Sequence, residues 1–128
     1  MSSPGKALKR ALDRCRRRHP RYRAEFPVVV TLLSEGNRQR LDGHCRDISQ
    51  AGIGVLIAAD LDLGEVVTLA FSLPEARDSW EIRAVIRHRR GYHYGFEFLS
   101  LSDDQKRALT GYLRELDRAD SDEADPAH

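Results

Sequence analysis

The sequence predicts a mainly β fold: a six-stranded antiparallel barrel with a short helix before it and a second helix after it. Between Phe26 and Leu99, short runs of alternating apolar and polar residues follow one another, which is typical of strands. The runs are separated by short Gly- or Pro-containing segments, and no helical pattern intervenes as parallel βαβ units would require. With 128 residues, 41% of them hydrophobic and 32% charged, the chain has room for one such domain.

Charge divides the chain into three parts. Residues 1–23 contain nine basic residues and one acidic residue, and residues 115–128 contain six acidic residues and one basic residue. We therefore expect a basic N-terminal helix and arginine-rich loop in residues 1–23, the barrel with its C-terminal helix in residues 24–118, and an acidic disordered tail in residues 119–128.

The N-terminal segment is expected to form a helix over residues 3–15. Ser3 is a suitable cap, Pro4 suits the first turn, and apolar residues recur at helical spacing on one face: Leu8, Ala11, Leu12 and Cys15. Residues 16–23 are expected to form an extended loop, because Pro20 disfavours helix at the residue before it.

The strands follow from the alternation. Pro27 to Leu33 is a dense Val/Leu run, which indicates a strand buried on both faces. Turn signals are expected at Gly36-Asn37, at 60–64 and at 89–91. The further strands are predicted at 38–48, 53–57, 67–73, 80–87 and 94–98.

The C-terminal helix is predicted to begin at Ser102, where Ser102 and Gln105 match a capping box. One apolar stripe should cover an open side or end of the barrel, and it consists of Leu109, Tyr112, Leu113 and Leu116.

Two short segments carry candidate chemistry. In the first, Arg17 and Arg21 flank Pro20, and four residues of extended chain could bring both guanidinium groups to one ligand. Such a pair can clamp a phosphate or stack on a purine. A solvated cluster that binds polyanions loosely is the alternative.

The second segment runs from Asp47 to Gly52. In a strand, Asp47 and Ser49 lie on the same side, where a carboxylate can accept the amino and imino hydrogens of a guanine edge and a hydroxyl can contact phosphate or base. Gly52 allows a bend and a close approach of the backbone to a ligand. A Ser-containing turn that closes a hairpin is the alternative.

Together, the order and spacing of the two segments resemble the PilZ domain, a bacterial receptor module for cyclic di-GMP. The signature of that family is RxxxR in an N-terminal loop followed by D/N-x-S-x-x-G in the barrel, matched here by Arg17–Arg21 and Asp47–Gly52. Pro27-Val28 is similar to the entry into the first strand of the family. The segments 84–87 and 94–98 are similar to its closing hairpin.

The resemblance implies that the protein binds cyclic di-GMP and is not an enzyme. Arg17 and Arg21 would contact phosphates and guanines, Asp47 and Ser49 would hold a guanine edge, and Gly52 would keep the surface clear. Additional candidate contacts are Arg16, Arg18 and Gly54. Arg16, directly before the first motif, would support a stacked pair of nucleotides. We therefore expect one or two ligand molecules per protomer. Ordering of the arginine loop on binding would relay the signal to a downstream protein partner.

A small barrel with a basic N-terminal arm that binds nucleic acid is the alternative function. It is not favoured, because the aromatic residues Tyr94, Phe96 and Phe98 share one strand face that is better explained as core than as a stacking platform.

Other classes lack support in the sequence. Cys15, His19, His44 and Cys45 do not have the spacing of a metal site, no catalytic motif is present, and no cofactor is expected. No apolar run reaches the ~20 residues of a membrane helix. With two cysteines and no secretory signal pattern, a cytoplasmic location is expected.

Overall fold

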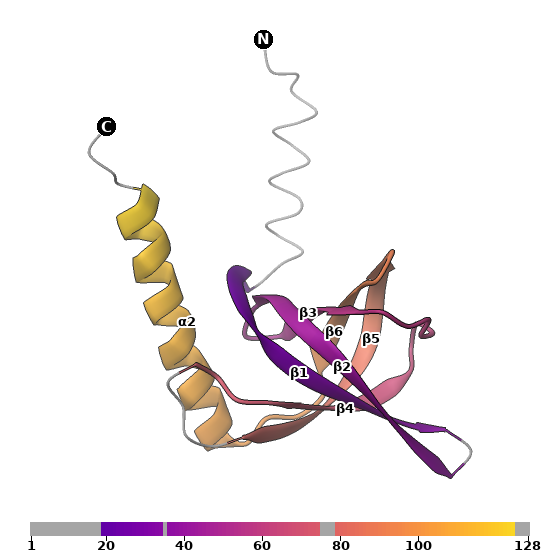
Figure 1. Ribbon diagram of the computed structural model, residues 1–128. Helices are drawn as coiled ribbons and strands as arrows, with labels where there is room; N and C mark the ends of the chain where they lie inside the picture. Colours follow the sequence, from indigo (N-terminus) through magenta and orange to yellow (C-terminus); the bar gives the residue numbers. More distant parts are fainter. Residues whose placement is uncertain (1–18, 35, 75–78, 125–128) are drawn as a thin grey trace, which may run out of the picture.

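The computed structural model describes residues 19–34, 36–74 and 79–124. In these residues, six strands form one closed antiparallel barrel in the order β1-β2-β3-β6-β5-β4, and β4 pairs back with β1. A single long helix, α2, leans against one side of it (Figure 1). The elements are β1 (Tyr22–Ser34), β2 (Asn37–Ile48), β3 (Gly52–Ile57), β4 (Val66–Phe71), β5 (Trp80–Arg90), β6 (His93–Phe98) and α2 (Asp103–Ala124). The predicted mainly β class and six-stranded antiparallel barrel are therefore confirmed.

The core of the barrel follows the alternation in the sequence. Buried and more exposed residues alternate along much of β1, β4 and β5, and the largest fully buried side chains include Tyr94, Phe96, Ile48 and Ile53. The prediction that the first strand is buried on both faces is wrong, because β1 alternates between the core and solvent and Leu33 is 70% exposed. One face of an antiparallel sheet commonly meets water, and the dense Val/Leu run concealed this alternation.

The tight turns lie where the sequence indicated them. Gly36, Gly64 and Gly91 all have positive φ, at 81°, 86° and 62°, a conformation that glycine adopts without steric penalty. Near one of these turns the Tyr94 hydroxyl accepts a hydrogen bond from the Leu61 amide (2.9 Å) and donates one to the Ala59 carbonyl (2.6 Å). This pair of bonds ties the β3–β4 connection to β6.

Helix α2 begins with the predicted capping box. The Ser102 amide donates to Gln105 Oε1 at 2.9 Å and the Gln105 amide donates to Ser102 Oγ at 3.1 Å. The predicted apolar stripe is confirmed: Leu109 and Leu113 are buried in the core, with Tyr112 and Leu116 packed against it. The helix continues to Ala124, so the expected disordered tail from residue 119 is wrong for its first six residues. No helix among the described residues is long and apolar enough to cross a membrane.

At its N-terminal end the barrel begins earlier than expected. Strand β1 starts at Tyr22, because Tyr22 and Arg23 pair with Ile48 and Asp47 of β2, so the last two residues of the predicted loop belong to the sheet. The predicted helix over residues 3–15 lies outside the described residues, as do Arg16, Arg17 and Arg18.

Candidate functional site

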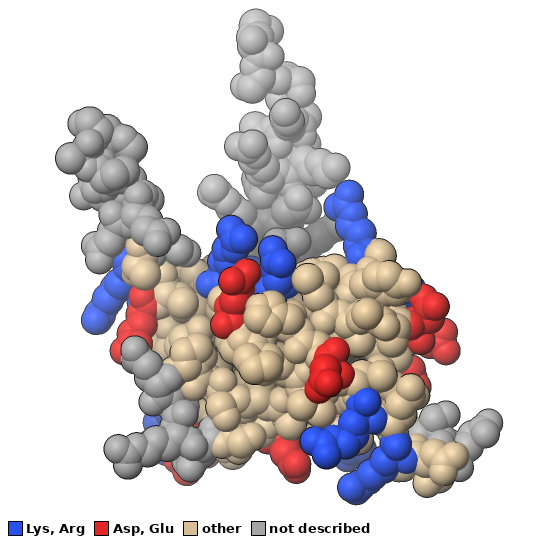
Figure 2. Space-filling view, in the orientation of Figure 1, with Lys and Arg blue, Asp and Glu red and all other residues tan. Residues whose placement is uncertain are grey.

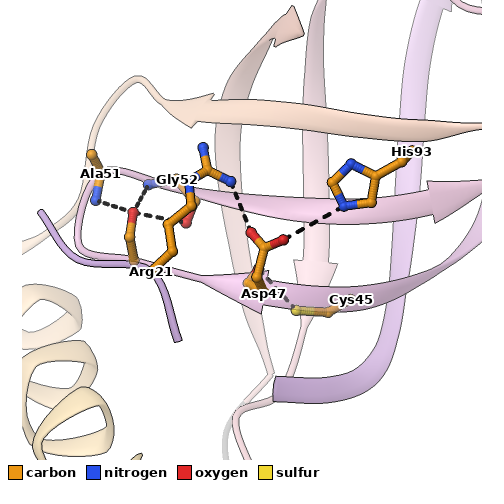
Figure 3. A network of polar contacts seen from close by, with 7 residues as sticks. Arg21, Cys45, Asp47, Ala51, Gly52 and His93 are labelled. Carbon is orange, nitrogen blue, oxygen red and sulfur yellow. Dashed lines mark hydrogen bonds and ion pairs between the residues drawn. The ribbon is translucent and has the colours of Figure 1, made fainter. Parts of the chain in front are cut away.

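The candidate site is built around Asp47, near the end of β2. The register between β2 and β3 shifts between Cys45 and Asp47, which is a β-bulge that redirects the following side chain. The Asp47 carboxylate accepts a hydrogen bond from Arg21 through Oδ1 at 2.8 Å, and its Oδ2 lies 3.5 Å from His93 Nε2. Figure 3 shows the carboxylate between these two side chains. Both of its oxygens are thus engaged.

Gly54 gives the carboxylate its space. Asp47 and Gly54 are partners across β2 and β3, and a Cβ built on Gly54 would lie 2.7 Å from both carboxylate oxygens. Any side chain at position 54 therefore requires the carboxylate to move. The sequence suggested Gly54 only as an additional ligand contact, whereas here it makes room for another site residue.

Ser49 and Gly52 form the tight turn between β2 and β3. The Ser49 hydroxyl, which is buried, accepts hydrogen bonds from the amides of Ala51 and Gly52, each at 3.1 Å. The Ser49 amide donates to the Gly52 carbonyl at 2.8 Å. The Ser-containing turn, the alternative interpretation of this segment, is thus present, and the serine stabilises it.

The backbone that approaches Gly52 closely is that of β6. A Cβ on Gly52 would lie 2.1 Å from the Phe96 carbonyl oxygen, a distance that no packed structure allows. Gly52 is thus needed for the pairing of β3 with β6, whereas the sequence suggested a close approach to a ligand.

Two open cavities share Arg21 as a wall. The first, of about 340 Å³, is lined by His19, Arg21, Ser49, Ala51, Gly52, Arg87, His88, Gly95, Phe96 and Glu97. The second, of about 540 Å³, is lined by Arg21, Tyr22, Arg23, Arg46, Asp47, Leu56 and His93. Their size is sufficient for parts of a nucleotide-sized ligand.

The structure brings Arg21, Asp47 and Gly54 together but separates Asp47 from Ser49. The two motif side chains were expected on one side of a strand, yet Ser49 lines the first cavity and Asp47 lines the second. The strand alternation does not apply to this pair, because β2 ends at Ile48 and Ser49 already belongs to the turn. Arg17 lies outside the described residues.

Sequence reasoning missed several residues at this site. His93 reaches Asp47 only because β3 pairs with β6, a crossover that no local pattern reveals. His88, on the neighbouring strand β5, is not the partner of His93: it pairs with Gly95, and His93 pairs with Arg90.

Gln50, at an unspecified position of the second motif, hydrogen-bonds through Nε2 to Thr110 Oγ1 of α2. The motif turn is therefore tied directly to the C-terminal helix. Glutamine and threonine are too common for the sequence alone to indicate this contact.

The charges around the site are mostly basic. On the face in Figure 2, one group of basic side chains lies near the start of β1 and a second lies near the β1–β2 hairpin. The Arg21–Asp47 pair is only partly shielded, with side chains 30% and 28% exposed. Cys45, two residues before Asp47, is fully buried, while its neighbour His44 faces solvent. Desolvation by burial, with the nearby Asp47 charge, raises the pKa of the Cys45 thiol to about 12.

The arrangement suits a ligand that carries both negative charge and hydrogen-bond donors. Guanidinium groups bind phosphate oxygens in a forked geometry. A carboxylate can accept two parallel hydrogen bonds from a guanine edge through its two oxygens. Among the described residues, no group of three or more histidines, cysteines and carboxylates lies together as a metal would require.

Comparison with known proteins gives a consistent picture. The family model for the PilZ domain matches residues 16–115. A comparison with curated protein sequences gave no match. Among solved structures, the PilZ domain of YcgR from Escherichia coli, determined with c-di-GMP, superposes with a TM-score of 0.60 at 22% identity, covering 88% of this chain and 99% of that domain.

Two longer proteins share the same fold. YcgR from Escherichia coli in complex with c-di-GMP gives a TM-score of 0.64 at 24% identity, over 86% of this chain and 50% of that one. The Bacillus subtilis inhibitor of motility MotI/DgrA gives 0.61 at 22% identity, over 77% and 50%. The chain thus spans about half the length of these two structures.

Proposed function

Because the chain belongs to the PilZ domain family, we propose that it is a receptor for cyclic di-GMP, without catalytic activity. The ligand is bound through the two signature segments, Arg17–Arg21 and Asp47–Gly52. Arg17 and Arg21 contact phosphates and guanine faces, and Asp47 accepts a guanine edge. Ser49 and Gly52 form the turn that lines the first cavity.

The observation that carries this proposal is the contact between Arg21 and Asp47. The two residues are 26 positions apart, one from each signature segment, and their side chains meet at 2.8 Å. This contact supports the proposal, because a guanidinium group that can bind phosphate and a carboxylate that can accept a guanine edge lie side by side on the surface. Arg21 lines both cavities and Asp47 lines the second.

Binding then requires an exchange of partners. A guanidinium group and the amino and imino edge of guanine present the same kind of parallel N–H donors, so they compete for the Asp47 oxygens. When guanine binds the Asp47 carboxylate, the Arg21 guanidinium separates from Asp47 and binds the ligand phosphate. The phosphate then replaces Asp47 as the negatively charged partner of Arg21.

The signal is passed to a downstream protein partner by ordering of the arginine loop on the ligand. The Gln50–Thr110 contact supports α2 as part of the responding surface, since any shift of the motif turn reaches the helix directly. Arg16 and Arg18 provide further ligand contacts, and the stoichiometry is one or two molecules per protomer. We place this function in the bacterial cytoplasm.

Calorimetric titration with cyclic di-GMP at physiological salt tests the proposal, with GTP and a short DNA duplex as competitors. We expect saturable binding at micromolar affinity or better, unaffected by DNA, and the measured stoichiometry distinguishes one ligand from two. Arg40→Ala serves as a control variant in the same titration. It removes an exposed arginine on the same strand as Asp47, and its binding should match that of the unmodified protein.

The alternative function predicts a different result. If cyclic di-GMP gives no heat while DNA binds with strong salt dependence, the receptor proposal is overturned and the basic N-terminal arm becomes the leading candidate for the binding surface.

A further inference from the structure

The second cavity contains cationic side chains that belong to neither signature segment. It is lined by three arginines, Arg21, Arg23 and Arg46, and by one carboxylate, Asp47. The remaining lining residues include Tyr22 and Leu56, so the cavity combines positive charge with an apolar surface. This combination suits a phosphate attached to a nucleoside better than a simple inorganic anion.

The single carboxylate in this lining does not neutralise the other arginines. Both of its oxygens are engaged, by Arg21 at 2.8 Å and by His93 at 3.5 Å. Arg21 and Asp47 therefore compensate each other, and the charges of Arg23 and Arg46 remain.

Those two arginines have little else to bind among the described residues. Arg46 Nε lies 3.8 Å from Glu25 Oε1, and the two side chains are 41% and 52% exposed. An ion pair this exposed contributes little free energy to folding. The described part of the chain places no carboxylate within ion-pair distance of Arg23. Both guanidinium groups are thus available to a ligand.

The backbone fixes both arginines beside Asp47. Arg23 is the direct partner of Asp47 across β1 and β2, and Arg46 is the residue at the β-bulge that precedes Asp47. These positions lie in paired strands, so their guanidinium groups start from rigid backbone, in contrast to an arginine on a loop.

We infer that Arg23 and Arg46 form a second phosphate-binding subsite, into which the ligand extends past Arg21 from the signature residues. The inference rests on the proposed function, and it adds two ligand contacts that the signature segments do not contain. His93 is a positioning residue here, because its Nε2 lies 3.5 Å from Oδ2 of the Asp47 carboxylate and both residues line the same cavity.

The test compares two double variants of the full chain by calorimetric titration with cyclic di-GMP. Arg23→Ala with Arg46→Ala removes the subsite, and affinity should fall at least about tenfold, since each arginine loses a charge-assisted contact. The matched control is Arg38→Ala with Arg40→Ala, which removes the same charge from exposed positions at the far end of β2; its affinity should change less than about twofold.

A further variant separates fold from binding. Arg23→Lys with Arg46→Lys retains the charge and the methylene stems but loses the forked geometry, so its affinity should lie between wild type and the alanine variant, with an unchanged melting temperature. Equal losses in the subsite and control variants, or no loss in either, would overturn the subsite while leaving the receptor function intact. Absence of binding by the wild-type protein would overturn both.

Discussion

The Asp47 carboxylate lies directly over Gly54, the residue opposite it on β3, so closely that a Cβ at position 54 would approach both oxygens to 2.7 Å. The atoms in the way are the end of a side chain, which can rotate. The position of the carboxylate, and not the pairing of the strands, therefore depends on this glycine.

Gly54→Ala should consequently impair binding more than folding. We expect the affinity for cyclic di-GMP to fall about tenfold or more, because the displaced carboxylate loses the geometry needed for two parallel hydrogen bonds. The free energy of unfolding should change by less than about 1 kcal/mol. Titration and urea unfolding of the same sample measure the two effects, and a large loss of stability with normal binding would contradict this account.

Gly52→Ala, in contrast, should impair folding more than binding. Its Cβ would lie 2.1 Å from the Phe96 carbonyl oxygen, so β3 and β6 would have to separate, and overpacking of this kind costs about 3 kcal/mol. Urea unfolding should show this loss directly. As the control, Gly111→Ala in α2 places its Cβ in open space and should stabilise the protein by up to about 1 kcal/mol.

The ion pair between Arg21 and Asp47 should matter for binding far more than for stability. Both side chains are about one-third exposed, at 30% and 28%, so the pair contributes less than about 1 kcal/mol to folding. Arg21→Ala and Asp47→Ala should each weaken cyclic di-GMP binding at least about tenfold.

A double-mutant cycle checks whether these two residues act on one ligand. If guanine and Arg21 share the Asp47 carboxylate, the affinity losses of the single variants should not add in the double variant. Strictly additive losses would indicate two independent contacts and would contradict the exchange of partners described above.

Cys45 should be unreactive in the native protein. Burial raises the pKa of its thiol from 9.0 to about 12, and only the thiolate reacts readily. In a Cys15→Ser background, a thiol reagent at about pH 8 should label Cys45 only after the protein is unfolded with denaturant. Rapid labelling of the folded protein would show that the core opens around β2.

The same pKa shift predicts a loss of stability in alkali. Above pH 9.0 the thiol ionises in the unfolded chain but remains protonated in the folded one until about pH 12, so the free energy of unfolding should decrease as the pH rises through this interval. Cys45→Ala removes this contribution, and its stability should depend less steeply on pH over the same range.

Local patterns in the sequence were sufficient for the elements of the fold. Alternation placed the strands, glycines placed the turns at Gly36, Gly64 and Gly91, and the capping box placed the start of α2. Two of the exceptions depend on context outside the segment itself. Whether the outer face of β1 meets water depends on what covers it, and whether the acidic segment after residue 119 is helical depends on the helix that precedes it.

The sequence by itself also identified Arg21 and Asp47 as candidate site residues, because their chemistry and spacing are local properties. Only the tertiary structure decided how they are used. The pairing of β3 with β6 brings His93 to Asp47. Arg46 lies at the β-bulge and lines the second cavity together with these two residues. The register of β2 with β3 sets Gly54 beside the carboxylate. The contact of His93 with Asp47 joins residues that are far apart in the chain, and the bulge and the register fix their geometry through pairing between strands, which no single strand encodes alone.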